Sequence, residues 1–127
     1  MNFDELPSLF KLTRSLSRHS TGRHKIGCII LDHGKPVSGG FNKPKTHPKW
    51  NYPNKLSIHA EVSAILSSGK NYMKNSVAIV YRERANGLPA MARPCKYCMR
   101  MLREFGVKKV IYSTNSYPYF TTEYISV

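Results

Sequence analysis

The sequence predicts an α/β fold in which a central mixed five-stranded sheet is covered by helices. Three observations support this prediction. Amphipathic helical patterns alternate with short apolar runs along the 127 residues, glycine and proline turns separate them, and no repeat or linker interrupts them. Elements that alternate in this way pack as layers around one core. A chain of this length fits one compact unit, so we expect residues 1–127 to form a single domain.

The first half of the chain predicts one helix and a β-hairpin. Residues 6–18 place apolar side chains at helical spacing, and a proline is tolerated in the first turn. Residues 25–31 form a short apolar run that predicts a buried strand. Residues 37–40 follow a turn rich in glycine and proline, so we expect them to pair antiparallel with that strand. The polar stretch 41–56 contains three prolines and predicts a loop.

The second half of the chain predicts two further helices with a strand between them. Ser57 is a suitable cap for a helix over about residues 58–68. Residues 77–82 are apolar and β-branched, which is typical of a strand. Residues 94–105 predict a helix that begins with a proline and ends before Gly106.

Two strands, over residues 109–113 and 121–127, are expected at the end of the chain. Seven residues separate them, whereas a parallel return usually needs a dozen or more, so we expect the two strands to be antiparallel. An extra stretch, residues 83–92, contains the tight-turn pair Asn86-Gly87. This stretch predicts a hairpin or flap beside the functional site, or a surface loop without a role.

The chain is strongly basic, with 20 Lys and Arg, 7 Asp and Glu and a net charge of +13. The basic residues are spread over both halves, which indicates a basic face and an anionic partner: a nucleotide phosphate or a nucleic-acid backbone. No apolar run approaches the roughly 20 residues that cross a membrane. The acidic amino terminus lacks an apolar stretch, so we expect a cytoplasmic protein without a membrane partner. The sequence sets no oligomeric state.

Three cysteines exclude a complete disulfide framework. Cys95 and Cys98 form a C-x-x-C pair, which in an intracellular protein indicates a metal or redox site. On its own such a pair is typical of half a structural zinc site, but the chain has no fourth cysteine to complete one. Cys28 lies in an apolar run and is predicted to be a small buried hydrophobe.

Two motifs, H-A-E at residues 59–61 and P-C-K-Y-C at residues 94–98, each fall at an expected helix start. Cys95 and Cys98 are three residues apart, so they share one face of the helix and reach one tetrahedral ion. A helix amino terminus also favours the thiolate form that binds metal. With His59 as the third ligand, one position remains for water, which is typical of catalytic zinc.

Glu61 is expected to be a proton shuttle and not a ligand. It follows His59 by two residues, about 200° around a regular helix. Both side chains face one site only if His59 lies at the helix mouth, outside the regular helix. A carboxylate placed there takes a proton from the activated water and passes it to the substrate.

The joint pattern of H-x-E with P-C-x-x-C resembles the zinc-dependent cytidine and deoxycytidylate deaminase superfamily. The resemblance implies the three-layer cytidine-deaminase-like fold, zinc as cofactor, and hydrolytic deamination of cytosine to uracil in a nucleoside or nucleotide. It also implies that Asn42 binds the substrate sugar, with an Asx turn as the alternative. The backbone around Gly27, Cys28 and Ala60 is expected to line the base pocket. Arg93, just before the second motif, meets either a phosphate or solvent.

Three hypotheses about function remain open at this point. The first is a deaminase of a free nucleoside or nucleotide. By family resemblance, the antiparallel arrangement of the last strands is similar to that of free-nucleoside deaminases and of some deaminases that act on polynucleotides, whereas typical deoxycytidylate deaminases have a helical crossover there. The second is a deaminase of single-stranded DNA or RNA, in which basic residues follow the phosphates and aromatic side chains stack on bases. The third is a zinc-bearing binding module without turnover, against which Glu61 argues. The aromatic candidates, which have packing at the sheet edge as their alternative role, are Tyr117, Tyr119, Phe120 and Tyr124.

Overall fold

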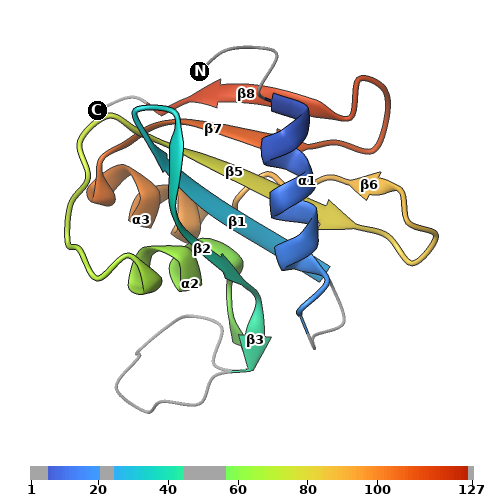
Figure 1. Cartoon of the computed structure of the whole chain (residues 1–127), viewed down its shortest axis with the longest axis horizontal. Helices are drawn as coiled ribbons and strands as arrows, with labels where there is room; N and C mark the ends of the chain where they lie inside the picture. Colours follow the sequence, from blue (N-terminus) through green and yellow to red (C-terminus); the bar gives the residue numbers. More distant parts are fainter. Residues whose placement is uncertain (1–5, 21–24, 45–56, 126–127) are drawn as a thin grey trace.

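The computed structural model describes residues 6–20, 25–44 and 57–125 as three layers, with a sheet between helices (Figure 1). The five main strands are ordered β2-β1-β5-β7-β8, and the short β6 pairs with β5. In chain order the elements are α1 (Leu6–Ser17), β1 (Lys25–Asp32), β2 (Lys35–Phe41), β3 (Lys43–Pro44), β4 (Ser57–Ile58), α2 (Ala60–Ser67), β5 (Ser76–Glu83), β6 (Pro89–Ala90), α3 (Lys96–Phe105), β7 (Val107–Ser113) and β8 (Phe120–Tyr124). The predicted helix-covered five-stranded sheet is confirmed.

The sheet is mixed, as predicted. Strand β1 is antiparallel to both β2 and β5, while β5 and β7 are parallel neighbours. Strands β7 and β8 are antiparallel, with Lys109 opposite Tyr124 and Ser113 opposite Phe120. The prediction that the last two strands form an antiparallel pair is therefore confirmed.

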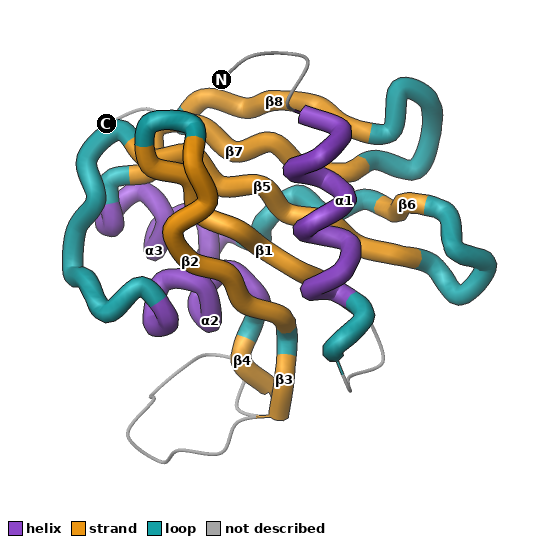
Figure 2. The backbone as a smooth tube through the Cα atoms, in the orientation of Figure 1, coloured by secondary structure: helices purple, strands orange, loops and turns teal. Residues whose placement is uncertain are grey.

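Helix α1 covers one face of the sheet, and α2 and α3 cover the other (Figure 2). Successive residues of a strand point to opposite faces, so the apolar run of β1 serves both layers. Ile29 and Leu31 pack in the cluster that includes Leu9 of α1, whereas Cys28 and Ile30 pack in the cluster under α2 and α3. A run that is buried on both faces explains why the strand lacks polar alternation.

Residues 83–92 form the predicted hairpin. Arg82 pairs with Ala90, and Glu83 pairs with Pro89, where β6 returns beside β5. Gly87 adopts a φ of 84°, a left-handed conformation that glycine takes without strain. The tight turn predicted at this point is confirmed.

The predicted starts of two helices and the end of the last strand need correction. Ser57 is not a helix cap, because residues 57–58 form β4 and pair with β3, so that α2 begins at Ala60. Helix α3 begins at Lys96 and not at residue 94, with Cys95 as its cap. Strand β8 ends at Tyr124, so the expected strand over 121–127 is too long. Of the predicted loop, residues 45–56 lie outside the described part of the chain.

An ion-pair cluster joins α1 to the end of β5. The carboxylate of Glu83 accepts hydrogen bonds from Arg14 Nε at 2.8 Å and from Arg18 Nε and Nη2 at 3.2 Å each. The side chain of Glu83 is only 7% exposed. Burial alone would raise its pKa, but the hydrogen bonds and charges of the two arginines outweigh burial and hold the pKa below its ordinary value. The ionised form of Glu83 therefore stabilises this corner of the fold.

None of the helices in the described residues is long and apolar enough to cross a lipid bilayer.

Candidate metal centre

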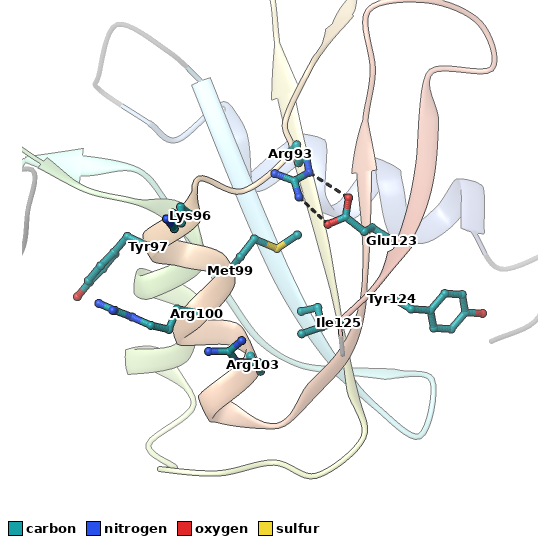
Figure 3. A pocket seen from close by; sticks show the side chains of 9 residues that line it. All are labelled: Arg93, Lys96, Tyr97, Met99, Arg100, Arg103, Glu123, Tyr124 and Ile125. Carbon is teal, nitrogen blue, oxygen red and sulfur yellow. Dashed lines mark hydrogen bonds and ion pairs between the residues drawn. The ribbon is translucent and has the colours of Figure 1, made fainter. Parts of the chain in front are cut away.

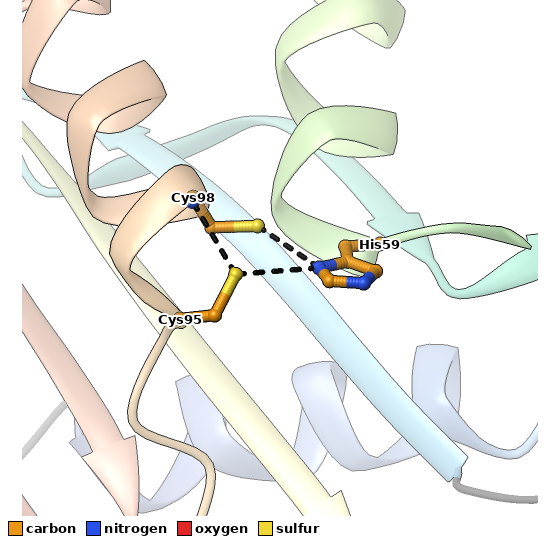
Figure 4. A group of neighbouring side chains, drawn as sticks. All are labelled: His59, Cys95 and Cys98. Carbon is orange, nitrogen blue, oxygen red and sulfur yellow. Dashed lines mark hydrogen bonds between the residues drawn. The ribbon is translucent and has the colours of Figure 1, made fainter. Parts of the chain in front are cut away.

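The three predicted ligands converge where α2 and α3 begin (Figure 4). The Nδ1 atom of His59 lies 3.2 Å from Sγ of Cys98 and 3.6 Å from Sγ of Cys95. The ligand atoms of all three residues lie within 4.8 Å of one another. Residues that are far apart in the sequence thus form one cluster of metal-binding atoms.

Local backbone conformation places His59 and Cys95 just outside their helices. His59 has φ −69° and ψ 153°, and Cys95 has φ −67° and ψ 167°, so both are extended residues at an N-cap position. The Cys95 sulfur accepts a hydrogen bond from the backbone N–H of Cys98 at 3.5 Å. This arrangement meets the condition set by the sequence: His59 lies at the helix mouth, where its side chain departs from the regular helical direction.

The donor set fits zinc. One imidazole nitrogen and two cysteine sulfurs are ligands that zinc prefers, and a fourth position remains for a water or substrate. Zinc–sulfur and zinc–nitrogen bonds of about 2.3 and 2.0 Å at tetrahedral angles place nitrogen and sulfur roughly 3.5 Å apart. The observed separations of 3.2 and 3.6 Å match this requirement. Cys98 is buried while Cys95 is exposed, so the cluster opens to solvent on one side.

Burial controls the ionisation of these ligands. It lowers the pKa of His59, which favours the neutral imidazole that binds metal. It raises the pKa of the Cys98 thiol well above its usual range, and the nearby charge of Glu61 adds to this effect. A bound cation would oppose the effects of burial and of the Glu61 charge on the pKa of the Cys98 thiol, because it stabilises the thiolate directly.

Glu61 lies beside the cluster without joining it. Its side chain is in the first turn of α2, is 5% exposed, and is absent from the group of converging ligand atoms. Burial raises the pKa of Glu61 to about 7, although hydrogen bonds with its own backbone and with Cys98 lower it in part. The structure therefore places a buried carboxyl group with a raised pKa next to the metal ligands.

Close packing of α2 on β2 fixes the position of His59. A Cβ atom added to Gly40 would lie 2.5 Å from the backbone nitrogen of Ala64 and 2.6 Å from Oγ of Ser63. Only a residue without a side chain allows this approach, so Gly40 sets the distance between the strand and the helix. The sequence analysis missed Gly40, because its only local signal is the Gly39-Gly40 pair.

Cys28 and Ala60 lie beneath the site and have no exposed surface. The prediction that Cys28 is a small buried residue is confirmed, because its sulfur is fully covered and packs in the core under α2 and α3. The backbone of Gly27 packs on α1, where an added Cβ would lie 2.5 Å from the carbonyl oxygen of Thr13. The contact of these residues with a substrate base stays a prediction.

Asn42 closes the open end of the β1–β2 hairpin. Its Oδ1 accepts a hydrogen bond from the backbone N–H of Ile26 at 3.1 Å, and its own N–H donates to the Ile26 carbonyl at 3.2 Å. The Oδ1 atom of Asn42 therefore bonds to the neighbouring strand, and the Asx-turn alternative stays a prediction. Its predicted contact with a substrate sugar stays a prediction.

Arg93 is held by Glu123 of β8. Its Nε and Nη2 atoms donate to the two carboxylate oxygens at 3.0 and 2.9 Å. The Arg93 side chain is still 51% exposed, and a phosphate at this position would have to share it with Glu123, so its contact with a phosphate or with solvent stays a prediction. A planar two-point bond of this kind orients the guanidinium firmly.

The candidate aromatic residues divide into packed and exposed ones. Phe120 lies 5.6 Å from Phe10 between ring centres and packs against the core under α1, so its edge-packing role is confirmed. Tyr117 and Tyr124 are 86% and 73% exposed. Only the exposed tyrosines are available to a ligand in this conformation.

A family profile identifies the chain. The profile described as "Cytidine and deoxycytidylate deaminase zinc-binding region" matches residues 4–114, which is most of the 127 residues. The chain belongs to this deaminase family. The matched residues include His59, Cys95 and Cys98, so the zinc-binding region of the family and the ligand cluster of the structure coincide.

Two curated relatives match this deaminase-family chain over different shares of its length. Deoxycytidylate deaminase of Schizosaccharomyces pombe is 24% identical over 130 residues, which cover 89% of this chain and 36% of the relative. The chloroplastic riboflavin biosynthesis protein PYRD of Zea mays is 34% identical over 76 residues, which cover 60% of this chain and 17% of the relative. The chain thus spans about a third or less of the length of these relatives.

Solved structures share the fold of the deaminase-family chain. The dCMP deaminase from the cyanophage S-TIM5 in apo form has a TM-score of 0.68 at 24% identity, with 90% of this chain and 86% of that chain covered. The structure of dCMP deaminase from the cyanophage S-TIM5 in complex with dCMP and dUMP has a TM-score of 0.64 at 20% identity, with 90% of this chain and 84% of that chain covered. At these identities the likeness supports the fold, and the cytidine-deaminase-like prediction is confirmed.

Proposed function

We propose that this chain is a hydrolase that uses zinc to deaminate cytosine to uracil in a free nucleoside or nucleotide. The observation that carries the proposal is the convergence of His59, Cys95 and Cys98 beside the buried carboxyl group of Glu61. Membership of the cytidine and deoxycytidylate deaminase family supports it. A purely structural zinc site does not require a buried carboxylic acid next to its ligands.

In this proposal the three converging residues hold the metal and Glu61 handles protons. His59, Cys95 and Cys98 provide one nitrogen and two sulfur ligands, which anchor the ion between the starts of α2 and α3. When bound, zinc supplies a nucleophilic water at neutral pH, because it lowers the pKa of that water toward about 7. Because Cys95 is exposed, substrate approaches from that side.

Glu61 serves as base and then as acid in the same turnover. Its carboxylate accepts a proton from the attacking water and delivers a proton to ring nitrogen N3 as oxygen adds at C4. Glu61 then takes the second proton of the same water from the new C4 hydroxyl and donates it to the 4-amino group, so that C4 becomes a carbonyl and ammonia leaves with the electron pair of the C4–N bond. The products are uracil and ammonia from cytosine and water. A pKa near 7 allows one group to perform both transfers.

Two observations bear on the size of the substrate. The antiparallel pairing of β7 and β8 supports a free nucleoside over a deoxynucleotide, by the family resemblance drawn from the sequence, although the same pairing is also similar to that of some polynucleotide deaminases. The names of the relatives support a monophosphate, since both the fission yeast protein and the cyanophage protein are described as deoxycytidylate or dCMP deaminases. Both substrates therefore belong in the first assay.

The test is a deamination assay with the zinc-loaded chain on cytidine, dCMP and a cytosine-containing single-stranded oligonucleotide. We expect uracil product and an equal amount of ammonia from at least one small substrate, with the signal absent in the Glu61→Gln variant. Turnover of the oligonucleotide alone would replace the proposed substrate class with a polynucleotide. A folded, zinc-loaded protein that turns over none of the three would instead be a binding module.

A further inference from the structure

A basic groove lies along α3, and none of the metal ligands is among the residues that line it (Figure 3). It has a volume of about 600 Å³ and runs between α3 and β8. Four basic side chains line it against one carboxylate: Arg93, Lys96, Arg100 and Arg103 against Glu123. This is a concentration of positive charge on a chain whose net charge is already +13.

The spacing of three of these residues places them in one row. Lys96, Arg100 and Arg103 are four and three residues apart, which puts them on one face of a helix. All three are exposed, whereas Cys98 and Leu102 on the opposite face are buried. The row extends for about 10 Å at 1.5 Å per residue and begins one residue after Cys95. The row therefore starts at the metal centre and leads away from it.

The charges of this row are not neutralised within the described part of the chain. Arg93 pairs with Glu123, but none of the ion pairs there involves Lys96, Arg100 or Arg103. Arg100 lies 5.8 Å above the ring of Tyr97, a cation–π contact that orders the guanidinium without cancelling its charge. The exposed Glu104, four residues after Arg100, forms no ion pair with the row among the described residues. Three adjacent cations repel one another, and an anion with several charges relieves that repulsion.

We propose that this groove binds the sugar–phosphate backbone of a single-stranded nucleic acid. A strand carries one phosphate per about 3.4 Å of helix axis, so a 10 Å row meets two to three phosphates. A mononucleotide has one phosphate group and engages only part of the row.

The same charges argue against burial of this face between two copies of the chain. The cores of protein interfaces are depleted of charged residues, and lysine is among the most depleted. Pairing two identical basic rows would also bring like charges together at close range. A flexible polyanion meets the row without this cost. Binding of a strand in the groove is independent of whether the metal centre deaminates a small substrate or a base in a strand.

The test measures binding of a labelled 20-nucleotide thymidine oligonucleotide to the full zinc-loaded chain by fluorescence anisotropy at 50–200 mM salt. Thymine has no amino group to lose, so the readout does not depend on the proposed deamination. The groove variant is Lys96→Gln/Arg100→Gln/Arg103→Gln. The matched control is a triple Lys→Gln variant in a separate hollow at the β1–β2 turn, with Lys35, Lys74 and Lys108 replaced.

Both variants remove three charges, so only their positions differ. Each phosphate contact contributes about −0.7 to the log–log salt slope, so we expect the groove variant to lose about two units of slope. Its affinity at 100 mM salt should fall at least tenfold, while the control stays within about threefold of the wild type. Arg100→Gln alone should lose about 0.7 units, which keeps the test informative if the triple variant folds poorly.

Three results would overturn the proposal. Equal losses in both triple variants would show that diffuse charge binds the strand. Unchanged binding in a groove variant that retains its zinc content and melting temperature would show that the groove is not used. A change in molar mass, measured by light scattering and confined to the groove variant, would show that the face is an interface between copies.

Discussion

Replacing Gly40 with alanine tests whether the packing of α2 on β2 holds the metal centre together. The added Cβ would lie 2.5 Å from the Ala64 nitrogen, whereas ordinary contacts of a Cβ atom begin at 3.4 Å. The nearest atoms are mainly helix backbone, which cannot rotate away as a side chain can. The helix and strand must therefore separate by about 1 Å, and His59 at the start of α2 moves with the helix.

The expected cost follows from this displacement. Overpacking of a close contact typically reduces the free energy of unfolding by about 1–3 kcal/mol. A shift of about 1 Å in a ligand or a proton shuttle typically costs roughly a hundredfold in activity, and both His59 and Glu61 move with the helix. We therefore expect Gly40→Ala to be less stable, to bind zinc more weakly and to turn over substrate roughly a hundredfold more slowly.

The matched control is the adjacent Gly39→Ala. An added Cβ at Gly39 would lie 2.7 Å from Cδ1 of Leu16. This atom is the end of a side chain of α1, which covers the face of the sheet opposite to α2. Leu16 relieves that contact by changing rotamer, so α2 stays in place. Denaturant unfolding and zinc competition with a chromophoric chelator measure both variants. Equal stability and equal zinc affinity for the two variants would refute the argument.

Three further predictions concern the site and the fold. Glu61→Gln keeps the shape of the side chain but cannot accept a proton, so turnover should fall at least roughly a hundredfold with zinc retained; near-normal turnover would remove Glu61 from the reaction. Cys95→Ala or Cys98→Ala should lose zinc by elemental analysis, whereas Cys28→Ala should keep it, and a zinc-free wild type that is active would contradict the ligand assignment. Glu83→Gln should lower the free energy of unfolding at pH 7 by about 1 kcal/mol, allowing for solvent screening of its exposed arginine partners. Because the folded pKa of Glu83 is depressed, its contribution is present above the unfolded value of about 4.3 and is lost as pH falls through the folded value. The stabilities of variant and wild type should therefore converge as the pH falls below the folded pKa, and a constant difference would refute this origin.

The sequence predicted the elements whose signals are local. The apolar run of β1 and the glycine-containing turn after it lie within a dozen residues, and both hold in the structure. The antiparallel end of the sheet followed from the short connection before β8. Strand β4 has no such signal, because its two residues become a strand only by pairing with β3, which lies 13 residues earlier in the chain. This long-range pairing overrides the capping chemistry of Ser57 and moves the start of α2.

The candidate site shows the same division between local and distant signals. The ligands were predictable because each motif combines a cap position with residue types that bind zinc. The neighbours of Asn42 and Arg93 were not predictable, because Ile26 and Glu123 lie 16 and 30 residues away in the sequence. Which of these pairs forms depends on strand register and on the path of the chain after β6, and neither is encoded near the two residues.

Helix α3 separates metal binding from polyanion binding on two faces of one element. Its inner face carries Cys98 and Leu102, four residues apart and fully buried, so a substitution there disturbs both the ligand cluster and the core. Its outer row of basic residues contacts none of the ligand atoms, so the removal of these charges should leave zinc binding intact. The two proposals are thus separable by variants of a single helix.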